Sequence, residues 1–350
     1  MYRAAVSEDV VGDAGALKRL WVDNLPVGAL ADAKLQWAYL DSPSGRGEAV
    51  LLRDAAGQPI GCAGVLLREL SVDGTPVRAA LLADFAVDRA HRVGFPAIVM
   101  QRTVKRHVEQ HYDLSYGFPN QHAVAVHLRT GYHQLGKMQR YVRVLRHGPY
   151  LERKTGMPVA AAIAGAAIDT GRYAILRAKA IVPSRGLALD WLAEPTPRFD
   201  RLWELGRKSV RIACRRDAAF LRWRFARKFD EQARFAVAVE RASGDVRAYA
   251  VVAGETGQLA ELRDLFGVDL ESTSALLSLL VPALYDRGHT AISVRFLGDP
   301  RVPSLLGEYD FQPRGGERVV IVSPGPKAPV DAATLRATAN WYITDLDEDT

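Results

Sequence analysis

Two ionisable side chains, Asp84 and His127, have the types and settings that proton transfer requires. Asp84 interrupts the apolar run Ala79–Val87, whose length and β-branched or aromatic end predict a largely buried strand. A free aspartate has a pKa of roughly 3.9, so Asp84 would accept a proton from an amine only if burial raised that pKa. His127 suits the opposite role, because an ordinary histidine pKa of about 6.5 leaves roughly a quarter of it protonated at neutral pH.

Both residues also have simpler interpretations. Asp84 could do no more than bind a cationic ligand or pair with an arginine. His127 could be a helix-face histidine that only packs or donates a hydrogen bond. The residues themselves leave these alternatives open.

A strand, a loop, a helix, a strand and a second helix surround these two residues. The loop Asp88–Pro96 is basic, contains Gly94 and ends in a proline suited to the first turn of a helix. Apolar residues then recur at three- and four-residue spacing up to Val108, which predicts an amphipathic helix. The strand Leu114–Phe118 and a helix ending at Thr130 complete the unit. Because a helix N-terminus carries unpaired N–H groups and a partial positive charge, the start of the first helix is a natural phosphate site.

This unit resembles the GNAT superfamily of N-acyltransferases, which hold the pyrophosphate of an acyl-coenzyme A on a loop of pattern R/Q-x-x-G-x-G/A. Arg92 and Ala97 match the ends of that pattern, whereas Phe95 stands at its central glycine and Gly94 lies one position early. The family also tends to show N-x6-Y-x3-G-F across its last helix. Four residues stand at those spacings, with histidine in place of tyrosine: Asn120, His127, Gly131 and Tyr132.

The resemblance implies acetyl-CoA or another acyl-CoA as co-substrate, with Asp84 as base and His127 as the acid that protonates the departing thiolate. Backbone N–H groups near Phe85 and Val87 would polarise the thioester carbonyl. Phe95 and Pro96 oppose phosphate binding, because a phenylalanine ring can obstruct the anion and proline has no N–H. The residues expected to hold the cofactor are Phe85, Val87, Arg92, Val93, Gly94, Ala97 and Asn120.

Length and composition favour a globular protein with more than one core. The chain has 350 residues, of which 48% are hydrophobic and 25% charged, and a net charge of +6. We expect no transmembrane segment and no secretion signal. The two distant cysteines, Cys62 and Cys214, predict reduced thiols of a cytoplasmic protein. The net positive charge suits an anionic ligand such as coenzyme A.

No metal site is expected. The segment His107–His111 looks like a zinc-binding helix, but its glutamate is one position late for H-E-x-x-H.

The second half of the chain repeats features of the first. Asp264-Leu265-Phe266 follows Asp84-Phe85-Ala86 at an offset of 180 residues, and Asp310-Phe311 follows Gly131-Tyr132 at an offset of 179. Nearly equal offsets suggest a duplicated fold. The second half has the acidic segment Gly267–Glu271 where the phosphate loop would be, and a leucine, Leu306, in place of His127. The sequence therefore predicts one cofactor site, in the N-terminal half.

The predicted fold class is α/β (α+β), with two tandem GNAT-like domains that each contain a mixed, mostly antiparallel sheet flanked by helices. We expect an acyl-CoA-binding domain at 1–147, closed by a strand at Gln139–Leu145, and a degenerate domain at 187–325 on the acceptor side. A connector at 148–186 carries a small-residue apolar helix, Val159–Ile168, that should be packed, and a role at a membrane surface is the alternative. A tail at 326–350 ends in acidic residues that should be solvated.

A basic stretch interleaved with aromatic residues lies in the second half. Alternating cations and aromatic rings suit an anionic or stacked ligand. The alternative is a helix with its aromatics in the core and its arginines in solvent. The residues expected to contact the acceptor are Arg216, Arg222, Trp223 and Arg224.

These features together predict an acyl-CoA-dependent N-acyltransferase that transfers an acyl group, most often acetyl, to a primary amine. A small molecule such as an amino sugar or amino acid is the expected acceptor, and a nucleic acid partner is not expected. Two alternatives remain at this point: a tandem GNAT-type transferase that takes an aminoacyl group from transfer RNA, and a non-catalytic acyl-CoA-binding module. The sequence does not indicate an oligomeric state.

Overall fold

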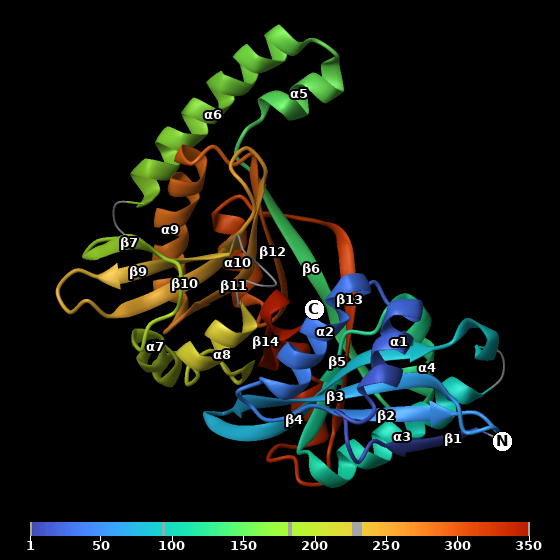
Figure 1. The fold of residues 1–350 in the computed structure, drawn as a ribbon. Helices are drawn as coiled ribbons and strands as arrows, with labels where there is room; N and C mark the ends of the chain where they lie inside the picture. The colour runs from blue at the N-terminus through green and yellow to red at the C-terminus, as the bar shows by residue number, and fades with distance from the viewer. Residues whose placement is uncertain (1, 93–94, 181–183, 226–232, 349–350) are drawn as a thin grey trace.

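One continuous sheet runs through the protein. The computed structural model describes residues 2–92, 95–180, 184–225 and 233–348. Within them, twelve of the fourteen strands follow the order β1-β2-β3-β4-β5-β13-β6-β12-β11-β10-β9-β7, and β8 and β14 lie off this path (Figure 1). Most neighbouring strands are antiparallel, whereas β4 and β5, and β11 and β12, are parallel. The structure confirms the predicted fold class.

In the N-terminal half, the strand, loop, helix, strand and helix around Asp84 and His127 occur in the predicted order. Its principal elements are β1 (Arg3–Val6), α1 (Ala14–Asn24), α2 (Ala31–Lys34), the π-helical turn η2 (Leu35–Leu40), β2 (Glu48–Arg53), β3 (Pro59–Val72), β4 (Thr75–Val87), α3 (Pro96–His111), β5 (Leu114–Gly117), α4 (Gln121–Arg129) and β6 (His133–Val144). Short 3-10 turns lie at Gly28–Leu30 and Arg89–His91.

The C-terminal half begins after a helical hairpin. Its elements are α5 (Gly148–Thr155), α6 (Pro158–Ala180), β7 (Leu187–Leu192), α7 (Arg198–Gly206), β8 (Ile212–Cys214), α8 (Ala218–Arg224), β9 (Arg234–Glu240), β10 (Val246–Ala253), β11 (Leu259–Gly267), α9 (Leu270–Asp286), β12 (Ala291–Gly298), α10 (Arg301–Glu308), β13 (Gln312–Pro324), α11 (Ala332–Arg336), η4 (Thr338–Asn340), β14 (Trp341–Ile343) and η5 (Asp345–Asp347).

Helices cover both faces of the N-terminal part of the sheet. Met100 and Val104 of α3 pack into a cluster with Leu82 of β4. Trp21 of α1 packs into a separate cluster with Leu81, the next residue of the same strand. Because successive side chains of a strand point to opposite faces, β4 is buried on both sides, which explains its nearly continuous apolar sequence.

The two halves repeat the same order of elements, as the offsets in the sequence predict. The series β4-α3-β5-α4-β6 corresponds to β11-α9-β12-α10-β13. The last helix of each series is followed by a residue with left-handed backbone, Gly131 (φ +92°) and Asp310 (φ +61°). A buried aromatic comes next in both, Tyr132 and Phe311. The duplication is therefore visible in the fold as well as in the sequence.

The final strands of the two series are exchanged between the halves. Strand β13 pairs with β5 on one side and β6 on the other, and β6 in turn pairs with β12. The strand expected at Gln139–Leu145 is present in β6, which ends at Val144, but β13 and not β6 occupies the place next to β5. Apolar alternation marks a strand but does not specify its partner, which is chosen by contacts distant in sequence. The proposed boundaries at 147 and 187 stay a prediction, and the halves they separate are interleaved.

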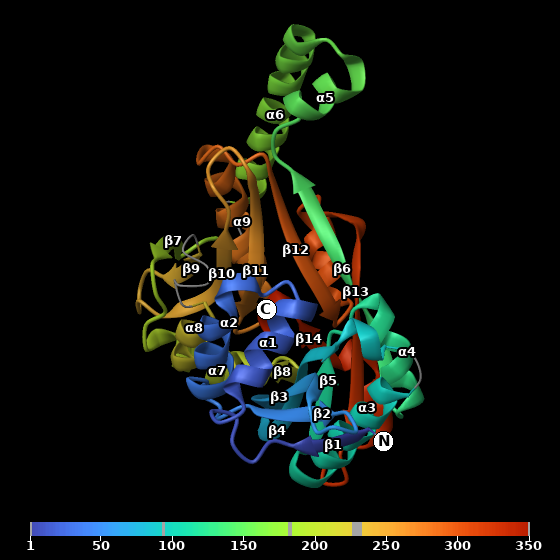
Figure 2. The same ribbon diagram turned by 45° about the vertical axis from the view of Figure 1, so that its right-hand side comes forward.

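The connector is a helical hairpin that projects away from the body of the protein (Figures 1 and 2). Contrary to the expectation of a packed helix, α6 exposes large apolar side chains along its length. They are Val159, Ile163, Ile168 and Ile175, with Met157 just before the helix. The stretch Pro158–Ala178 is also long and apolar enough to cross a membrane, although no transmembrane segment was expected, and 22% of its most apolar part is buried.

The acidic C-terminal segment is buried, which corrects the prediction of a solvated tail. Asp345, Asp347 and Glu348 are each at least nine-tenths buried. Their carboxylates pair with arginines: Asp345 with Arg295 (3.1 Å), Asp347 with Arg216 (3.2 Å) and Glu348 with Arg318. Buried carboxylates need such partners to offset their loss of hydration. The prediction of a solvated tail was wrong because the arginine partners of these carboxylates lie far away in the sequence.

We predict that Arg216→Leu lowers the free energy of unfolding by about 3–5 kcal/mol, because it leaves the buried carboxylates of Asp264 and Asp347 without their cation. Urea denaturation followed by circular dichroism measures this loss. Arg222→Leu is the matched control, because among the described residues Arg222 makes a single hydrogen bond, to the Pro195 carbonyl (3.0 Å), and it should cost about 1 kcal/mol. Equal losses in the two variants would contradict the prediction.

Candidate functional site

A β-bulge near the end of β4 sets the conformation of Asp84. The register between β3 and β4 shifts so that Asp84 and Phe85 lie opposite the single residue Ala63. Asp84 adopts φ +52°, a left-handed conformation that is rare for residues other than glycine, asparagine and aspartate. β-Bulges are over-represented next to active sites, where they change the direction in which a side chain points.

Two side chains from the α2–η2 segment hold the Asp84 carboxylate. Tyr39 donates its hydroxyl to Oδ2 (2.7 Å), and the Lys34 ammonium pairs with Oδ1 (2.8 Å). Gly64 on β3 allows this approach, because a Cβ at that position would overlap the Tyr39 hydroxyl. Asp84 therefore faces a cation in a buried setting, which matches neither a solvent-exposed carboxylate nor the arginine pair considered from the sequence.

Strands β4 and β5 diverge beside this bulge. Their last paired residues are Leu82 and Gly117, where β5 ends. Strand β4 continues as Ala83–Val87. Backbone groups on the β5 side of this extension therefore have no ladder partner in β5. The Val87 carbonyl accepts from Arg92 Nε (2.8 Å), and the use of backbone N–H groups near Phe85 and Val87 by a ligand stays a prediction.

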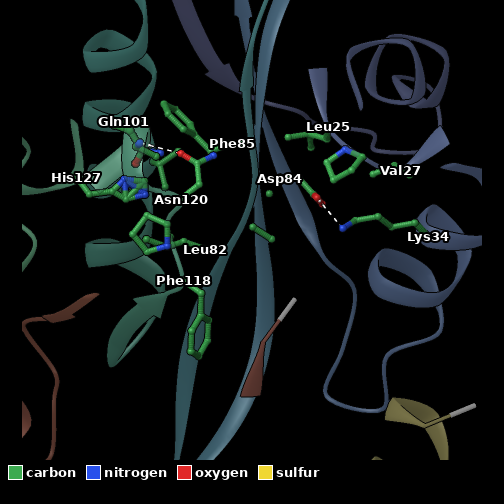
Figure 3. A pocket seen from close by; sticks show the side chains of 17 residues that line it. Leu25, Val27, Lys34, Leu82, Asp84, Phe85, Gln101, Phe118, Asn120 and His127 are labelled. Carbon is green, nitrogen blue, oxygen red and sulfur yellow. Dashed lines mark hydrogen bonds and ion pairs between the residues drawn. The ribbon is translucent and has the colours of Figure 1, made fainter. Parts of the chain in front are cut away.

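A cavity of about 200 Å³ lies in this opening and reaches both sides of β4. Figure 3 shows Asp84 and Lys34 on one side of the strand and Phe85, Gln101, Asn120 and His127 on the other. Its remaining lining is mostly apolar: Leu25, Pro26, Val27, Ala63, Gly64, Leu82, Ala83, Val104, Phe118, Pro119 and Ala123. The structure thus brings together four of the predicted site residues, Asp84, Phe85, Asn120 and His127.

His127 is buried on the inner face of α4. Its ring contacts Phe85 and Tyr132 with centroids 5.5 and 5.4 Å apart. Among the described residues, its Nδ1 has no hydrogen-bond partner. Burial lowers the pKa of His127 to about 4, because the charged form loses hydration that nothing replaces. The sequence-based expectation of a partly protonated histidine at neutral pH therefore fails for the free protein.

Asn120 has a clear structural role as the N-cap of α4. Its side-chain oxygen accepts from the backbone N–H groups of His122 (3.1 Å) and Ala123 (3.0 Å). The cap fixes the start of the helix that carries His127 and leaves Asn120 at the cavity wall.

Sequence reasoning missed three residues of the site, namely Lys34, Tyr39 and Gln101. Gln101 is almost completely buried on α3, and within the described part of the chain its Oε1 has no hydrogen-bond partner. Gln101 lies on the apolar face of α3, between Ala97 and Val104, and a polar residue at such a position could have identified it as a site residue from the sequence. Lys34 and Tyr39 gave no such signal, because only the fold places their helix against β4.

The structure describes part of the predicted phosphate loop. Arg92 donates its Nε to the Val87 carbonyl (2.8 Å) and its Nη2 to Asn24 (3.0 Å), which ties the loop to the end of β4 and to α1. Val93 and Gly94 lie outside the described residues. The side chain of Phe95 is 74% exposed and does not line the cavity. The ring therefore does not fill the cavity, and its predicted obstruction of a phosphate at the loop stays a prediction. Pro96 is buried at the first turn of α3 with Ala97 behind it.

The four residues predicted to contact an acceptor make internal contacts instead of lining this cavity. Trp223 stacks on Trp37 with centroids 4.9 Å apart, and each indole donates to the other residue's carbonyl. Arg224 donates to the Asp345 and Leu346 carbonyls. Arg222 donates to the Pro195 carbonyl, and Arg216 lies in the buried ion network described above.

Asp264, the counterpart of Asp84 in the second half, is buried and does not line this cavity. Asp264 is completely buried beside a register shift between β10 and β11. It pairs with Arg216 (3.2 Å) and accepts hydrogen bonds from Tyr249 and Thr344. A guanidinium and the C-terminal segment therefore surround this carboxylate, whereas a cavity opens at Asp84.

The described residues contain no cluster of three or more potential metal ligands. In the predicted zinc-like helix, His107 pairs with Glu48 through its Nε2 (2.6 Å) and its ring lies against that of His111.

We predict that His127 makes stability depend on pH between about 4 and 6.5. The unfolded chain binds a proton to this histidine at a higher pH than the folded protein does, so stability falls as the pH is lowered through this window. The contribution is up to about 3 kcal/mol. Urea titrations at several pH values should show a flatter pH dependence for His127→Phe than for the wild type. His122→Phe, an exposed histidine on the same helix, should retain the wild-type slope, and an unchanged slope in His127→Phe would refute the assignment.

Comparison with known proteins supports the fold. No protein-family model and no curated protein matches the sequence. A GCN5-related N-acetyltransferase from Anabaena variabilis is similar in structure, with a TM-score of 0.65, 11% identity and coverage of 91% of this chain and 72% of that one. A probable N-acyltransferase from Enterococcus faecalis is similar with a TM-score of 0.62 and 10% identity, over 93% of this chain and 73% of that one. A GCN5-related N-acetyltransferase from Kribbella flavida is similar with a TM-score of 0.60 and 13% identity, over 92% of this chain and 71% of that one. The chain therefore has a GNAT-like fold, as the resemblance in its sequence predicted.

Proposed function

We propose that this protein is an acyl-CoA-dependent N-acyltransferase that transfers an acyl group, most often acetyl, to the primary amine of a small molecule. The observation that carries the proposal is the ammonium of Lys34 at 2.8 Å from Asp84, on the wall of a cavity where β4 and β5 diverge. It shows that this carboxylate accommodates a primary ammonium in a largely apolar setting. Structural similarity to N-acetyltransferases supports the general class of reaction.

The acyl side of the proposed site lies across β4 from Asp84. Gln101 and His127 line the cavity, and their buried Oε1 and Nδ1 atoms lack partners among the described residues, which supports a site for a ligand's amide and carbonyl groups. The free backbone edge of β4 adds N–H donors that would stabilise a developing oxyanion. These groups fit the amide-containing arm and the thioester of an acyl-CoA.

The acceptor side is the Asp84 side of the strand. An acceptor ammonium would bind the carboxylate by the same charge pairing that Lys34 makes, and Asp84 would take the proton that the amine must lose before it attacks. Tyr39 holds the carboxylate in place through Oδ2. Asp84 thus has two roles in the proposal, recognition of the cation and removal of its proton.

The burial of His127 changes the role expected for it. Because its pKa lies near 4, His127 is neutral at pH 7 and would not supply a proton as an imidazolium. A neutral imidazole still has one N–H donor and one acceptor nitrogen. We therefore propose that His127 orients the thioester by a hydrogen bond. We assign protonation of the leaving sulfur to no residue of this chain.

The arginines predicted to contact an acceptor do not favour the transfer RNA alternative. Arg216 and Arg224 are buried, and Arg222 donates to the Pro195 carbonyl. A cytoplasmic location stays a prediction.

Asp84→Asn should lower kcat with acetyl-CoA and a primary amine by about 10²–10⁴-fold, because it removes the proton acceptor while keeping the side-chain shape. A thiol-release assay measures the rate. Asp190→Asn, an exposed aspartate on β7, should leave the rate unchanged. Full activity in Asp84→Asn would remove the proposed base.

We expect isothermal titration calorimetry to show saturable binding of acetyl-CoA, weakened by Arg92→Glu, because a carboxylate beside the loop at the start of α3 repels the diphosphate. Arg241→Glu is the matched control. It makes the same charge change at an arginine that likewise donates to a backbone carbonyl, that of Leu187 (3.1 Å), and it should bind normally. Binding of transfer RNA that weakens steeply with salt, without acetyl-CoA binding, would favour the RNA-dependent alternative. Acetyl-CoA binding with no turnover of any amine would indicate the non-catalytic module.

A further inference from the structure

We propose that the α5–α6 hairpin inserts its tip into one leaflet of an anionic phospholipid bilayer and so holds the protein at a membrane surface. The hairpin links the two halves and projects from the body in both views (Figures 1 and 2). This inference does not depend on the proposed acyl transfer.

Between Pro158 and Ile168, the exposed surface of α6 is apolar on every side that does not face the protein. Only Ala161, Gly165, Asp169 and Leu176 are buried among the described side chains of the helix. Opposite and beside this stripe, the helix exposes large apolar side chains and alanines. Those exposed between Pro158 and Asp169 are Val159, Ala160, Ala162, Ile163, Ala164, Ala166, Ala167 and Ile168. A helix in water has a polar face, and one that is apolar all round belongs in a core or in hydrocarbon.

The size of the hairpin suits one leaflet. Pro158–Ala178 has the length and composition of a membrane span. The chain enters and leaves the hairpin on the same side, however, because Gly148 crosses α6 at Gly165, where a Cβ would overlap the Gly148 backbone. The part of α6 beyond this crossing, Pro158–Ala164, is about 10 Å long. That length matches the depth of about 5–10 Å to which interfacial helices are buried.

The root of the hairpin is fixed, so the tip is held away from the body. Asp169 pairs with His147 Nδ1 (2.5 Å) and accepts from the His147 backbone N–H (3.2 Å). Farther along α6, Arg172 pairs with Asp310 (3.0 Å) and Arg177 with Asp286 (2.8 Å). These contacts lie C-terminal to the apolar tip, which leaves the tip itself without charged residues on α6.

A bilayer explains the hairpin better than a second copy of the chain does. Pairing of two helices in water needs one apolar stripe and leaves the outer faces polar, whereas the tip of α6 has no polar face. Lys154 is exposed three residues before Met157, which is itself exposed. A lysine beside an inserted tip, on a protein of net charge +6, adds attraction to anionic headgroups.

Co-sedimentation with vesicles tests the proposal. The full-length protein is mixed with vesicles of phosphatidylcholine containing about 30% phosphatidylglycerol, or of phosphatidylcholine alone. We expect the wild type to sediment with the anionic vesicles and more weakly with the neutral ones. Val159→Glu combined with Ile163→Glu should weaken partitioning about tenfold or more.

A matched control keeps the experiment interpretable. Leu205→Glu/Val22→Glu places two glutamates at exposed apolar residues of α7 and α1, away from the hairpin, and should bind vesicles like the wild type. Circular dichroism and thermal unfolding show that each variant is folded. The proposal is overturned if the wild type stays in the supernatant with both vesicle types, or if the hairpin variant binds as well as the control. It is equally overturned if analytical ultracentrifugation shows a dimer that the hairpin substitutions abolish while no protein binds lipid.

Discussion

A buried carboxylate beside a strand irregularity must have a cation close to it, and the two halves of this protein meet that requirement differently. Asp84 is paired with a lysine ammonium that lies at the wall of a cavity. Asp264 is paired with a fully buried arginine whose guanidinium also reaches Asp347. A lysine ammonium is a compact charge on a flexible stem, whereas a guanidinium forms several fixed hydrogen bonds at once. The first arrangement leaves room for a ligand amine, and the second forms part of the core.

The C-terminal segment completes the sealed half. Thr344 donates to Asp264, and the three acidic residues that follow bind arginines from α8, β12, β13 and the loop before α8. Strand β14 pairs with β12 and β8, and β8 in turn pairs with β3 of the first half. Disruption of this segment would therefore affect both halves of the sheet.

The exchanged strands join the halves further. Because β13 lies between β5 and β6, and β6 reaches β12, neither sheet is complete without a strand from the other half. The hairpin that links the halves leaves the body directly after β6. The exchange of strands makes the two halves one continuous sheet. It also leaves the opening between β4 and β5 bordered by α3 and α4 of the first half, where Gln101 and His127 are placed.

The sequence by itself determined the local elements. The apolar run around Asp84 and the proline that begins α3 follow from short-range periodicity and helix-start signals. The resemblance to the GNAT superfamily, with the nearly equal offsets of the repeat, implied the fold class and placed Phe85, Asn120 and His127 at the site beside Asp84. Only the tertiary structure decided which strand lies beside β5, what pairs with Asp84, the neutral state of His127 and the burial of the acidic tail. Each of these depends on residues far apart in the chain, because desolvation and ion pairing are set by neighbours in space, and periodicity along the sequence carries no information about them.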